Sequence, residues 1–322
     1  MKPFKPGAVG DIDVVIPTYN RLWALKRSIP FYLAQQEVKS IIVVNDASTD
    51  GTAAWLTKYC KNEPRLKHIT HEKNKGQSAA LNRGADFSEA SMVFSADDDM
   101  IMRPHNALSI LRKELVDNSG DVISPIFHLL EQESSVNMIF NVHGKNKQSL
   151  FSPILEFKPW RRLVNELNGS TFYCCTLPGL MLMKKEVLNA VRFDEEFGRS
   201  NYRDETDFQL KALRKGFRLL ACPEVNMIGF ANIDDKGGCY HSMNLFAYEL
   251  QSCRNNWRFL VRHKDVLNHF LRNPYPIEII QARFIMKHLG RDLPERVVVT
   301  LVEHTRERIR TGESRNIQQR RQ

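Results

Sequence analysis

The feature of this sequence that most constrains its fold is the alternation of short β-branched runs with amphipathic segments over the first 125 residues. Candidate strands are Ile12–Ile16, Ile41–Val44, Leu66–Ile69, Met92–Phe94 and Asp121–Ile126. Candidate helices between them are Leu22–Gln36, Thr52–Lys61, Ser78–Phe87 and Asn106–Val116. Strands and helices that alternate in this way form mostly parallel sheets covered by helices. The pattern therefore predicts an α/β fold.

Polar residues directly follow three of these candidate strands. They are Pro17–Asn20 after the first strand, Asn45–Ser48 after the second and Asp97–Asp99 after the fourth. In open α/β sheets, ligands bind outside the carboxyl ends of the strands, where such loops converge. The sequence therefore predicts a ligand site at this edge of the sheet.

The remainder of the chain is less regular. Phe127–Leu167 has no clear period, and we interpret it as an insertion or an acceptor-facing region. After it, the sequence predicts regular structure at Leu180–Val191, a helix at Asp204–Lys215 ended by Gly216, a strand at Leu219–Cys222 and a long amphipathic helix around Phe246–Leu260.

Charge is unevenly placed along the chain. The net charge is +9, and residues 254–322 alone hold 15 Lys and Arg against 7 Asp and Glu. This basic C-terminal tail could contact anionic lipid headgroups. Because no nucleic-acid-binding motif accompanies it and aromatic residues are sparse, we expect no nucleic acid partner.

The sequence also carries signals of its compartment. No run of 18 apolar residues occurs, and the six cysteines show no C-x-x-C spacing. Residues 1–10 carry two lysines without the apolar run of a signal peptide. We expect a cytoplasmic protein, with contact between the basic tail and the inner face of a membrane as an open alternative.

The triplet Asp97-Asp98-Asp99 is a candidate metal site. Carboxylate oxygens are hard ligands and suit Mg²⁺ or Mn²⁺. Acidic clusters after strands also cap turns and helices, so the triplet taken alone has two interpretations.

Several segments, in their order along the chain, resemble the signatures of family 2 glycosyltransferases with the GT-A fold. The resemblance covers about Asp11 to Glu224 and rests on Val14–Asn20, Val43–Thr52, Asn74–Gly76, Ala80–Gly84, Asp97–Asp99 and Asp204–Phe208. It implies an inverting transferase that uses Mn²⁺ or Mg²⁺ and moves a hexose or N-acetylhexosamine from a UDP-sugar. The acceptor would be a hydroxyl of a glycan, a lipid-linked sugar or a small natural product.

The resemblance also implies a division of the chain. Residues 1–125 would form the nucleotide-sugar-binding half of one domain and residues 126–235 its acceptor-binding and catalytic half. Residues 236–322 would form a C-terminal helical extension that ends in the basic tail.

The resemblance gives roles to individual residues on the donor side. Asp97 and Asp99 would hold the metal, Asp98 would contact ribose, and Asp46 would accept a hydrogen bond from the uracil imide. His241 follows two glycines, and a mobile loop could deliver it to the metal or the diphosphate. Other donor-binding candidates are Pro17, Thr18, Tyr19 and Asn20 around the base, and Lys75 and Gln77 before a helix, where phosphate or ribose could bind.

On the acceptor side, Glu205 is the candidate base that takes the proton of the attacking hydroxyl. The family usually shows Glu-Asp here, with the second carboxylate as base, whereas this chain has Asp204-Glu205. The exchanged order leaves Asp204 as an alternative base. From the residues alone, Asp204, Glu205 and Asp207 could equally be first-turn acids that complement a helix dipole.

Two other functions stay open at this stage. A nucleotidyltransferase that makes nucleotide sugars also pairs an α/β sheet with acidic metal ligands, but its Gly-rich N-terminal signature is missing. A sugar or polyanion binder that kept the fold and lost catalysis is the other alternative, and the acidic triplet with Glu205 argues against it. No P-loop or dinucleotide-binding glycine motif follows any candidate strand.

Overall fold

The computed structural model describes residues 10–130, 170–173, 177, 179–229, 237–269 and 276–289 of the 322-residue chain. The chain divides into two compact units, and the division in sequence falls after Tyr248. The first unit contains the sheet, and the second consists of helices in its described part. Most of the irregular segment Phe127–Leu167, from residue 131 on, lies outside the described residues.

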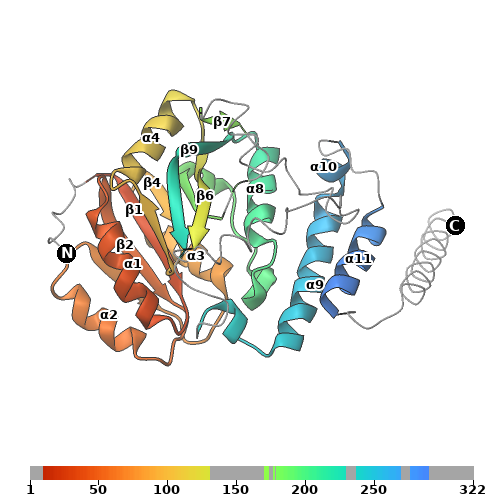
Figure 1. Ribbon diagram of the computed structural model, residues 1–322, viewed down its shortest axis with the longest axis horizontal. Helices are drawn as coiled ribbons and strands as arrows, with labels where there is room; N and C mark the ends of the chain where they lie inside the picture. Colours follow the sequence, from red (N-terminus) through yellow and green to blue (C-terminus); the bar gives the residue numbers. More distant parts are fainter. Residues whose placement is uncertain are drawn as a thin grey trace, which may run out of the picture. The chain divides into compact units, whose positions relative to one another are not determined.

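The first unit is built on one mixed sheet (Figure 1). In spatial order the strands are β3 (Leu66–Thr70), β2 (Val38–Asn45), β1 (Ile12–Thr18), β4 (Met92–Ser95), β8 (Met181–Lys184), β6 (Val122–Leu130), β9 (Leu219–Gly229) and β5 (Met100–Arg103), with β7 (Phe172–Tyr173) beside β9. The strands β3, β2, β1 and β4 run parallel to one another, and β8 is antiparallel to both β4 and β6. β9 is parallel to β6, and the short strands β5 and β7 pair antiparallel with β9. The expected α/β sheet is confirmed.

Helices cover both faces of this sheet (Figure 1). One face carries α1 (Leu22–Ala34), α2 (Thr52–Cys60) and α4 (Ala107–Asp117), and the other carries α3 (Gln77–Phe87), α7 (Lys185–Ala190) and α8 (Asp204–Arg214). Successive side chains of a strand point to opposite faces. Thus Val14 packs in the core with α1 and α4, and Val15 packs in the core with α3 and α8. The near-continuous apolar runs of the strands are explained by burial on both faces.

Several boundaries differ from the sequence expectation. β1 continues two residues past Ile16, because Pro17 and Thr18 still pair with β2 while β4 has already ended beside Val15. Pro17 has no backbone N–H to donate. It is tolerated there because β4, the neighbour of β1 on the other side, has already ended, so no ladder hydrogen bond to β4 is lost. Leu180–Val191 divides into β8 and α7, and Met100–Arg103 forms a strand that the apolar pattern did not predict.

Strand register brings the polar clusters together. Thr18 pairs with Asn45 at the ends of β1 and β2, and Val15 pairs with Ser95 at the end of β4. These strands are parallel, so the residues that follow each of them emerge at one edge of the sheet. The fold therefore gathers the three motifs at one place.

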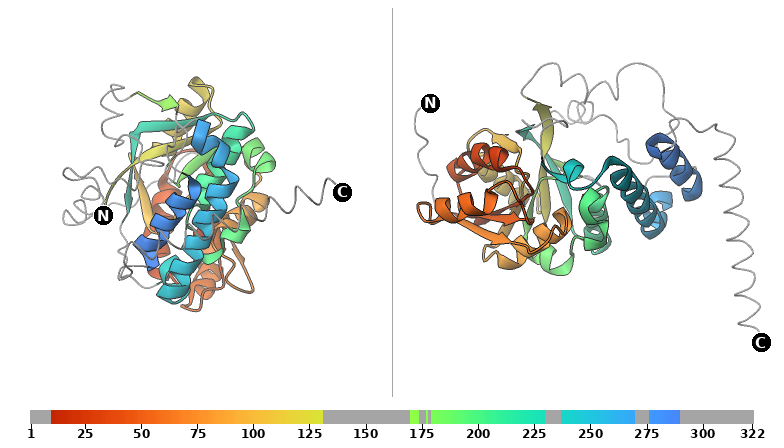
Figure 2. Two further views of the ribbon diagram at one scale, coloured as in Figure 1. Left: turned by 90° about the vertical axis from the view of Figure 1, so that its right-hand side faces the viewer. Right: turned by 90° about the horizontal axis from the view of Figure 1, so that it is seen from below.

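The second unit contains α9 (Leu245–Arg262), which begins just before the division, α10 (Lys264–His269) and α11 (Ile277–Leu289). α9 and α11 run side by side (Figure 2). The Gln281 side chain joins them, since its Nε2 donates to the Cys253 carbonyl at 2.8 Å and its Oε1 accepts from Asn256 Nδ2 at 2.8 Å. The predicted apolar stripe of α9 is buried at Cys253 and Leu260, but Phe246 is 69% exposed.

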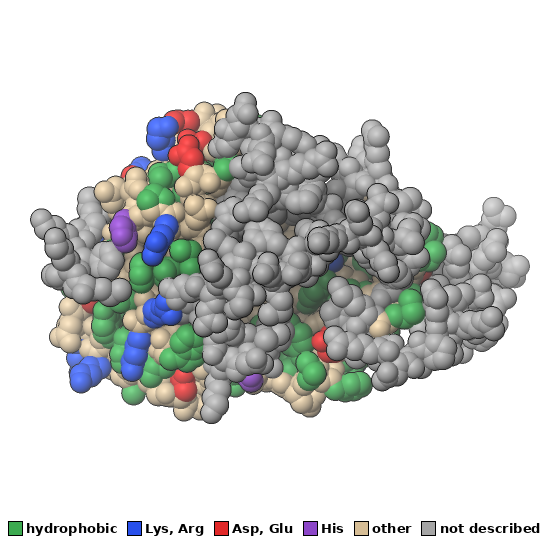
Figure 3. All heavy atoms as spheres, viewed as in Figure 1, with side chains coloured by type: hydrophobic (Ala, Val, Ile, Leu, Met, Phe, Trp, Pro, Cys, Tyr) green, Lys and Arg blue, Asp and Glu red, His purple; other side chains and the backbone are tan. Residues whose placement is uncertain are grey.

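None of the helices among the described residues is long and apolar enough to cross a membrane. On the face drawn in Figure 3, lysine and arginine side chains of the described residues lie between apolar and polar ones rather than in one continuous patch. Much of the predicted basic tail, from residue 290 on, lies outside the described residues, so its membrane contact stays a prediction.

Candidate functional site

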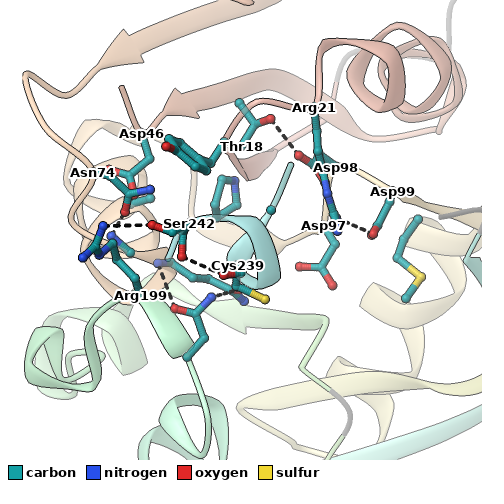
Figure 4. A pocket seen from close by; sticks show the side chains of 18 residues that line it. Thr18, Arg21, Asp46, Asn74, Asp97, Asp98, Asp99, Arg199, Cys239 and Ser242 are labelled. Carbon is teal, nitrogen blue, oxygen red and sulfur yellow. Dashed lines mark hydrogen bonds and ion pairs between the residues drawn. The ribbon is translucent and has the colours of Figure 1, made fainter. Parts of the chain in front are cut away.

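A pocket of about 250 Å³ opens at the carboxyl ends of β1, β2 and β4 (Figure 4). Asp97, Asp98 and Asp99 lie on one side of it, and Asp46 and Asn74 lie on the other. Arg199 from the short helix η1 (Glu195–Ser200) also lines it. Another part of the wall comes from the segment 237–242, through Gly238, Cys239 and Ser242.

Arg21 holds two carboxylates of the acidic triplet. Its Nη1 donates to Asp99 Oδ2 at 2.5 Å and to Asp98 Oδ1 at 3.2 Å (Figure 4). The other oxygen of Asp98 accepts from Thr18 Oγ1 at 2.7 Å. Asp98 is thus held by two residues at or just after the end of β1, Thr18 and Arg21. Neither of these contacts involves Asp97.

The triplet carries more negative charge than Arg21 offsets. Burial raises the pKa of Asp97 well above its usual value, and the neighbouring Asp99, Glu205 and Asp98 raise it further. Burial and Asp99 raise the pKa of Asp98 to about 7, against the lowering effect of Arg21. A raised carboxyl pKa means that the ionised form is poorly compensated. Added positive charge would therefore be stabilised here.

The donor set fits a hard divalent cation. Mg²⁺ and Mn²⁺ prefer carboxylate oxygens, and Asp97 and Asp99 provide them at the pocket. In the part of the chain that the structure describes, no group of three His, Cys, Asp or Glu side chains is already arranged around a common metal position. A cation held here would therefore complete its coordination with ligand or water oxygens.

Asp46 connects the end of β2 to the loop before α3. Its carboxylate accepts from the backbone N–H of Gly76 at 2.7 Å and of Lys75 at 2.9 Å, and lies 2.8 Å from His71 Nδ1. Its side chain is 6% exposed and lines the pocket. Asp46 therefore shapes the loop, whatever it also binds.

Asn20 performs a similar task between the first two loops. Its backbone lies in the left-handed region at φ 53°, which asparagine tolerates better than most residues. Its Oδ1 accepts from Thr49 N at 2.6 Å, and its N–H donates to Ser48 Oγ at 2.8 Å. Asn20 therefore ties the β1 and β2 loops together.

The two candidate bases differ in their surroundings at the start of α8. Asp204 is held on both oxygens, by Ser78 Oγ at 2.9 Å and by the Glu205 N–H at 2.8 Å. The Glu205 carboxylate accepts from Gln77 Nε2 at 3.1 Å. Burial and Asp204 raise the pKa of Glu205 to about 8, whereas burial raises that of Asp204 to about 7 against its hydrogen bonds. These contacts favour Asp204 as a structural anchor and Glu205 as the reactive carboxylate.

The segment 237–242 is tied down on both sides of the pocket. Gly238 N donates to the Tyr19 carbonyl at 2.8 Å, and Arg199 Nη1 donates to the Ser242 carbonyl at 3.0 Å. A Cβ on Gly238 would lie 2.6 Å from the Arg21 guanidinium, so the absence of a side chain permits this close approach. His241 is exposed, with Nδ1 3.0 Å from the Gly237 carbonyl.

The structure brings most predicted site residues to one place. Those that line the pocket are Pro17, Thr18, Tyr19, Asp46, Gln77, Asp97, Asp98 and Asp99. Asp204 and Glu205 contact Ser78 and Gln77 next to it. Asn20, Lys75 and His241 do not line it, and their functional roles stay predictions.

Sequence reasoning missed four polar residues that line the pocket. Arg21 directly follows the Pro17–Asn20 cluster, and its position before a helix at the pocket edge was the available signal. Arg199, Asn201 and Ser242 carry no such signal, because they lie in irregular segments whose approach to the pocket depends on the fold.

Comparison with known proteins gives a family match. The family model described as Glycosyl transferase family 2 matches residues 13–190. Glycosyltransferase GlyG of Streptococcus pneumoniae is 29% identical over 194 residues, which are 58% of this chain and 62% of that protein. The GalNAc(5)-diNAcBac-PP-undecaprenol beta-1,3-glucosyltransferase of Campylobacter jejuni is 28% identical over 190 residues, 58% of this chain and 55% of that protein. The match thus covers less than two thirds of either relative.

Solved structures show the same architecture. The crystal structure of GalNAc-T7 with UDP, GalNAc and Mn²⁺ superposes with a TM-score of 0.60 at 13% identity, over 87% of this chain and 54% of that one. S. aureus TarS 1–349 superposes with a TM-score of 0.50 at 17% identity, over 87% of this chain and 82% of that one. At these identities the likeness establishes the fold alone, which is the expected GT-A type with C-terminal helices.

Proposed function

Because the chain belongs to glycosyltransferase family 2, we propose that it transfers a hexose or an N-acetylhexosamine from a UDP-sugar to a hydroxyl acceptor, with inversion at the anomeric carbon. The Campylobacter jejuni relative is named as a glucosyltransferase for an undecaprenol-linked sugar, which supports a hexose donor and a lipid-linked acceptor. The GalNAc-T7 structure contains UDP, GalNAc and Mn²⁺, which supports a nucleotide-sugar donor and a metal. A glycan or a small natural product remains an alternative acceptor.

One observation carries this proposal. Three adjacent carboxylates line a pocket at the strand ends, and Asp97 is half-buried among negative neighbours that raise its pKa. Such a cluster is costly unless a cation completes it. Asp97 and Asp99 would hold that cation, which would neutralise the diphosphate that leaves as UDP.

The remaining residues would divide the work of binding. Pro17, Thr18 and Tyr19 would line the site of the base. Asp46 would accept from the uracil N–H in place of one of its contacts with the loop amides or His71, which together occupy both carboxylate oxygens. Arg199 would face phosphate or ribose oxygens. The segment 237–242 would cover the bound donor, and His241 would reach the metal only after leaving the Gly237 carbonyl.

Glu205 would act as the base. The acceptor oxygen forms a bond to the anomeric carbon while the bond from that carbon to the UDP oxygen breaks, and UDP leaves with the electron pair. The proton of the acceptor hydroxyl passes to Glu205. A carboxylate whose pKa is raised to about 8 is well matched to proton transfer near neutral pH.

The test follows product release from a panel of nucleotide sugars, with and without Mn²⁺. We expect free UDP to appear with one UDP-sugar and an acceptor, and to depend on the metal. In a parallel reaction supplied with UTP and a sugar 1-phosphate, release of pyrophosphate would instead indicate a nucleotidyltransferase. Binding of donor without turnover under any condition would indicate a sugar-binding protein and contradict the proposal.

Two variants separate the roles. Glu205→Gln keeps the size of the side chain and removes its basicity, so we expect donor binding close to that of the wild type and turnover reduced by about 10²-fold or more. Asp204→Asn keeps an acceptor for Ser78 Oγ. We expect it to retain most turnover, and the opposite order of the two effects would make Asp204 the base.

A further inference from the structure

A chain of three hydrogen bonds ends on the Glu205 carboxylate. The backbone N–H of Gln77 donates to Asn201 Oδ1 at 3.3 Å. Asn201 Nδ2 donates to Gln77 Oε1 at 3.1 Å. Gln77 Nε2 donates to Glu205 Oε1 at 3.1 Å. Two carboxamides thus lie between a helix N-terminus and the carboxylate.

The direction of every bond in this chain is determined. A backbone N–H can only donate, so the Asn201 oxygen must face it and its NH₂ group must face Gln77. The Gln77 oxygen then accepts, and its NH₂ group is turned toward Glu205. Reversing either carboxamide would place two donors or two acceptors against each other. The arrangement therefore presents an N–H to Glu205, which an ionised carboxylate accepts.

Backbone contacts fix the positions of the two carboxamides. Asn201 has φ 56°, in the left-handed region that asparagine tolerates. Ahead of Gln77, Gly76 lies against the η1 backbone, where an added Cβ would be 2.2 Å from the Gly198 carbonyl oxygen. The loops that carry Gln77 and Asn201 therefore have little freedom to separate.

Glu205 is enclosed from another direction as well. An added Cβ on Gly179 would lie 2.0 Å from Glu205 Oε1, so the carboxylate rests against the backbone of Gly179. With Gly179 at one contact and Gln77 at another, the longer glutamate side chain is held despite its extra rotatable bond. Holding a reacting group in one geometry is a large part of enzymatic rate enhancement.

We propose that Gln77 and Asn201 are positioning residues for Glu205, with Asn201 acting only through the carboxamide of Gln77. We call this pair of carboxamides the relay. The inference rests on the proposed function, in which Glu205 is the base. It also changes the role of Gln77, which the sequence suggested as a donor-binding residue. An N–H aimed at Glu205 stabilises its ionised form and orients the oxygen that receives the proton.

The test is a double-mutant cycle of Gln77→Met, Asn201→Gly and the double variant. Methionine has a similar length and cannot donate, and glycine keeps the left-handed backbone of position 201. We expect Gln77→Met to lower kcat by about 10- to 100-fold, the range for losing a hydrogen bond to a charged group, with the donor KM within about twofold. Asn201→Gly should lower kcat less, and should add nothing in the Gln77→Met background.

Two further measurements distinguish positioning from general damage. The acidic limb of the kcat/KM pH profile should move to higher pH in both single variants, because Gln77→Met removes the N–H donor to Glu205 and Asn201→Gly removes the contact that orients it. Gln36→Met makes the same replacement at an exposed side chain after α1, and should leave kcat, KM and the profile unchanged. If the double variant had a kcat lower than that of Gln77→Met by the full factor seen in Asn201→Gly, the two effects would be independent, and this would overturn the relay.

Failure of the relay and failure of the proposed function give different results. If the wild type turns over no nucleotide sugar, the proposed function fails, and the relay is then decided by the Glu205 pKa. That pKa can be followed by ¹³C NMR of labelled glutamate carboxyls, with Glu205→Gln identifying the resonance. It should rise in Gln77→Met and by no further amount in the double variant, and an unchanged pKa in Gln77→Met would overturn the relay.

Discussion

Arg21 is the internal counter-ion of the acidic triplet, and Arg21→Gln removes it. Its Nη1 lies 2.5 Å from Asp99 and 3.2 Å from Asp98, and the three side chains are 14%, 17% and 6% exposed. Breaking a fully buried pair costs about 3–5 kcal/mol. Partial exposure of Arg21 and Asp99 allows solvent screening, so we take about 2 kcal/mol as the cost here. Without divalent cation, we expect the variant to lose about that much free energy of unfolding.

The same pair should oppose metal binding. A cation that binds Asp99 in the wild type has to displace Arg21, whereas in Arg21→Gln the carboxylate is available. We therefore expect the variant to bind Mn²⁺ about 30-fold more tightly, because 1.4 kcal/mol corresponds to a factor of ten. Saturating Mn²⁺ should also raise the melting temperature of the variant more than that of the wild type.

Isothermal titration with Mn²⁺ in the absence of nucleotide measures this difference. Arg112→Gln is the matched control, because it removes a half-exposed ion pair with Glu37 that is worth less than about 1 kcal/mol. It should leave Mn²⁺ affinity unchanged. Equal or weaker Mn²⁺ binding by Arg21→Gln would refute the idea that Arg21 competes with the cation.

Three further predictions concern the same site. Asp99→Ala should abolish the metal dependence of UDP binding, measured by titration with and without Mn²⁺, and a retained dependence would remove Asp99 from the metal site. Gly179→Ala would place a Cβ 2.0 Å from Glu205 Oε1, so kcat should fall about tenfold or more while UDP affinity is kept, and unchanged kcat would mean that Glu205 is not held there. The raised pKa values of Asp204, about 7, and Glu205, about 8, mean that the folded state binds more protons than the unfolded state between about pH 4 and pH 8, so metal-free stability should fall as pH rises through this range. Urea midpoints should show this decline, Glu205→Gln should flatten it, and a wild-type midpoint that rises with pH would contradict the pKa shifts.

The part of the site at the strand ends, which we propose binds the donor, could be predicted from the sequence because its parts are local. The triplet and the β1 and β2 clusters each follow a buried strand, and parallel pairing alone brings strand ends together. The apolar runs locate those strands, so the motifs are located with them. This explains why Thr18, Asp46 and Asp98 line the pocket as expected.

The rest of the site depends on contacts between distant segments. Asn201 contacts Gln77 across 124 positions, and its left-handed backbone leaves no pattern in the sequence. Met100–Arg103 is a strand because it pairs with β9. The residues directly after the triplet show no periodic pattern, so the sequence did not predict this strand. Side-chain partners set by such packing cannot be read from residue types and spacing.

The backbone contact between Gly76 and Gly198 has a consequence for recombination between relatives. The loop before α3 and the η1 segment meet there, with no space for a side chain at position 76, although 122 positions separate the two glycines. A chimera that exchanges the residues from η1 onward would therefore preserve the junction only if the incoming segment can adopt the backbone of position 198, whose φ of 63° and ψ of −143° favour glycine. The two glycines therefore give a criterion for choosing crossover points. Both parents of a chimera should carry glycine at these two positions.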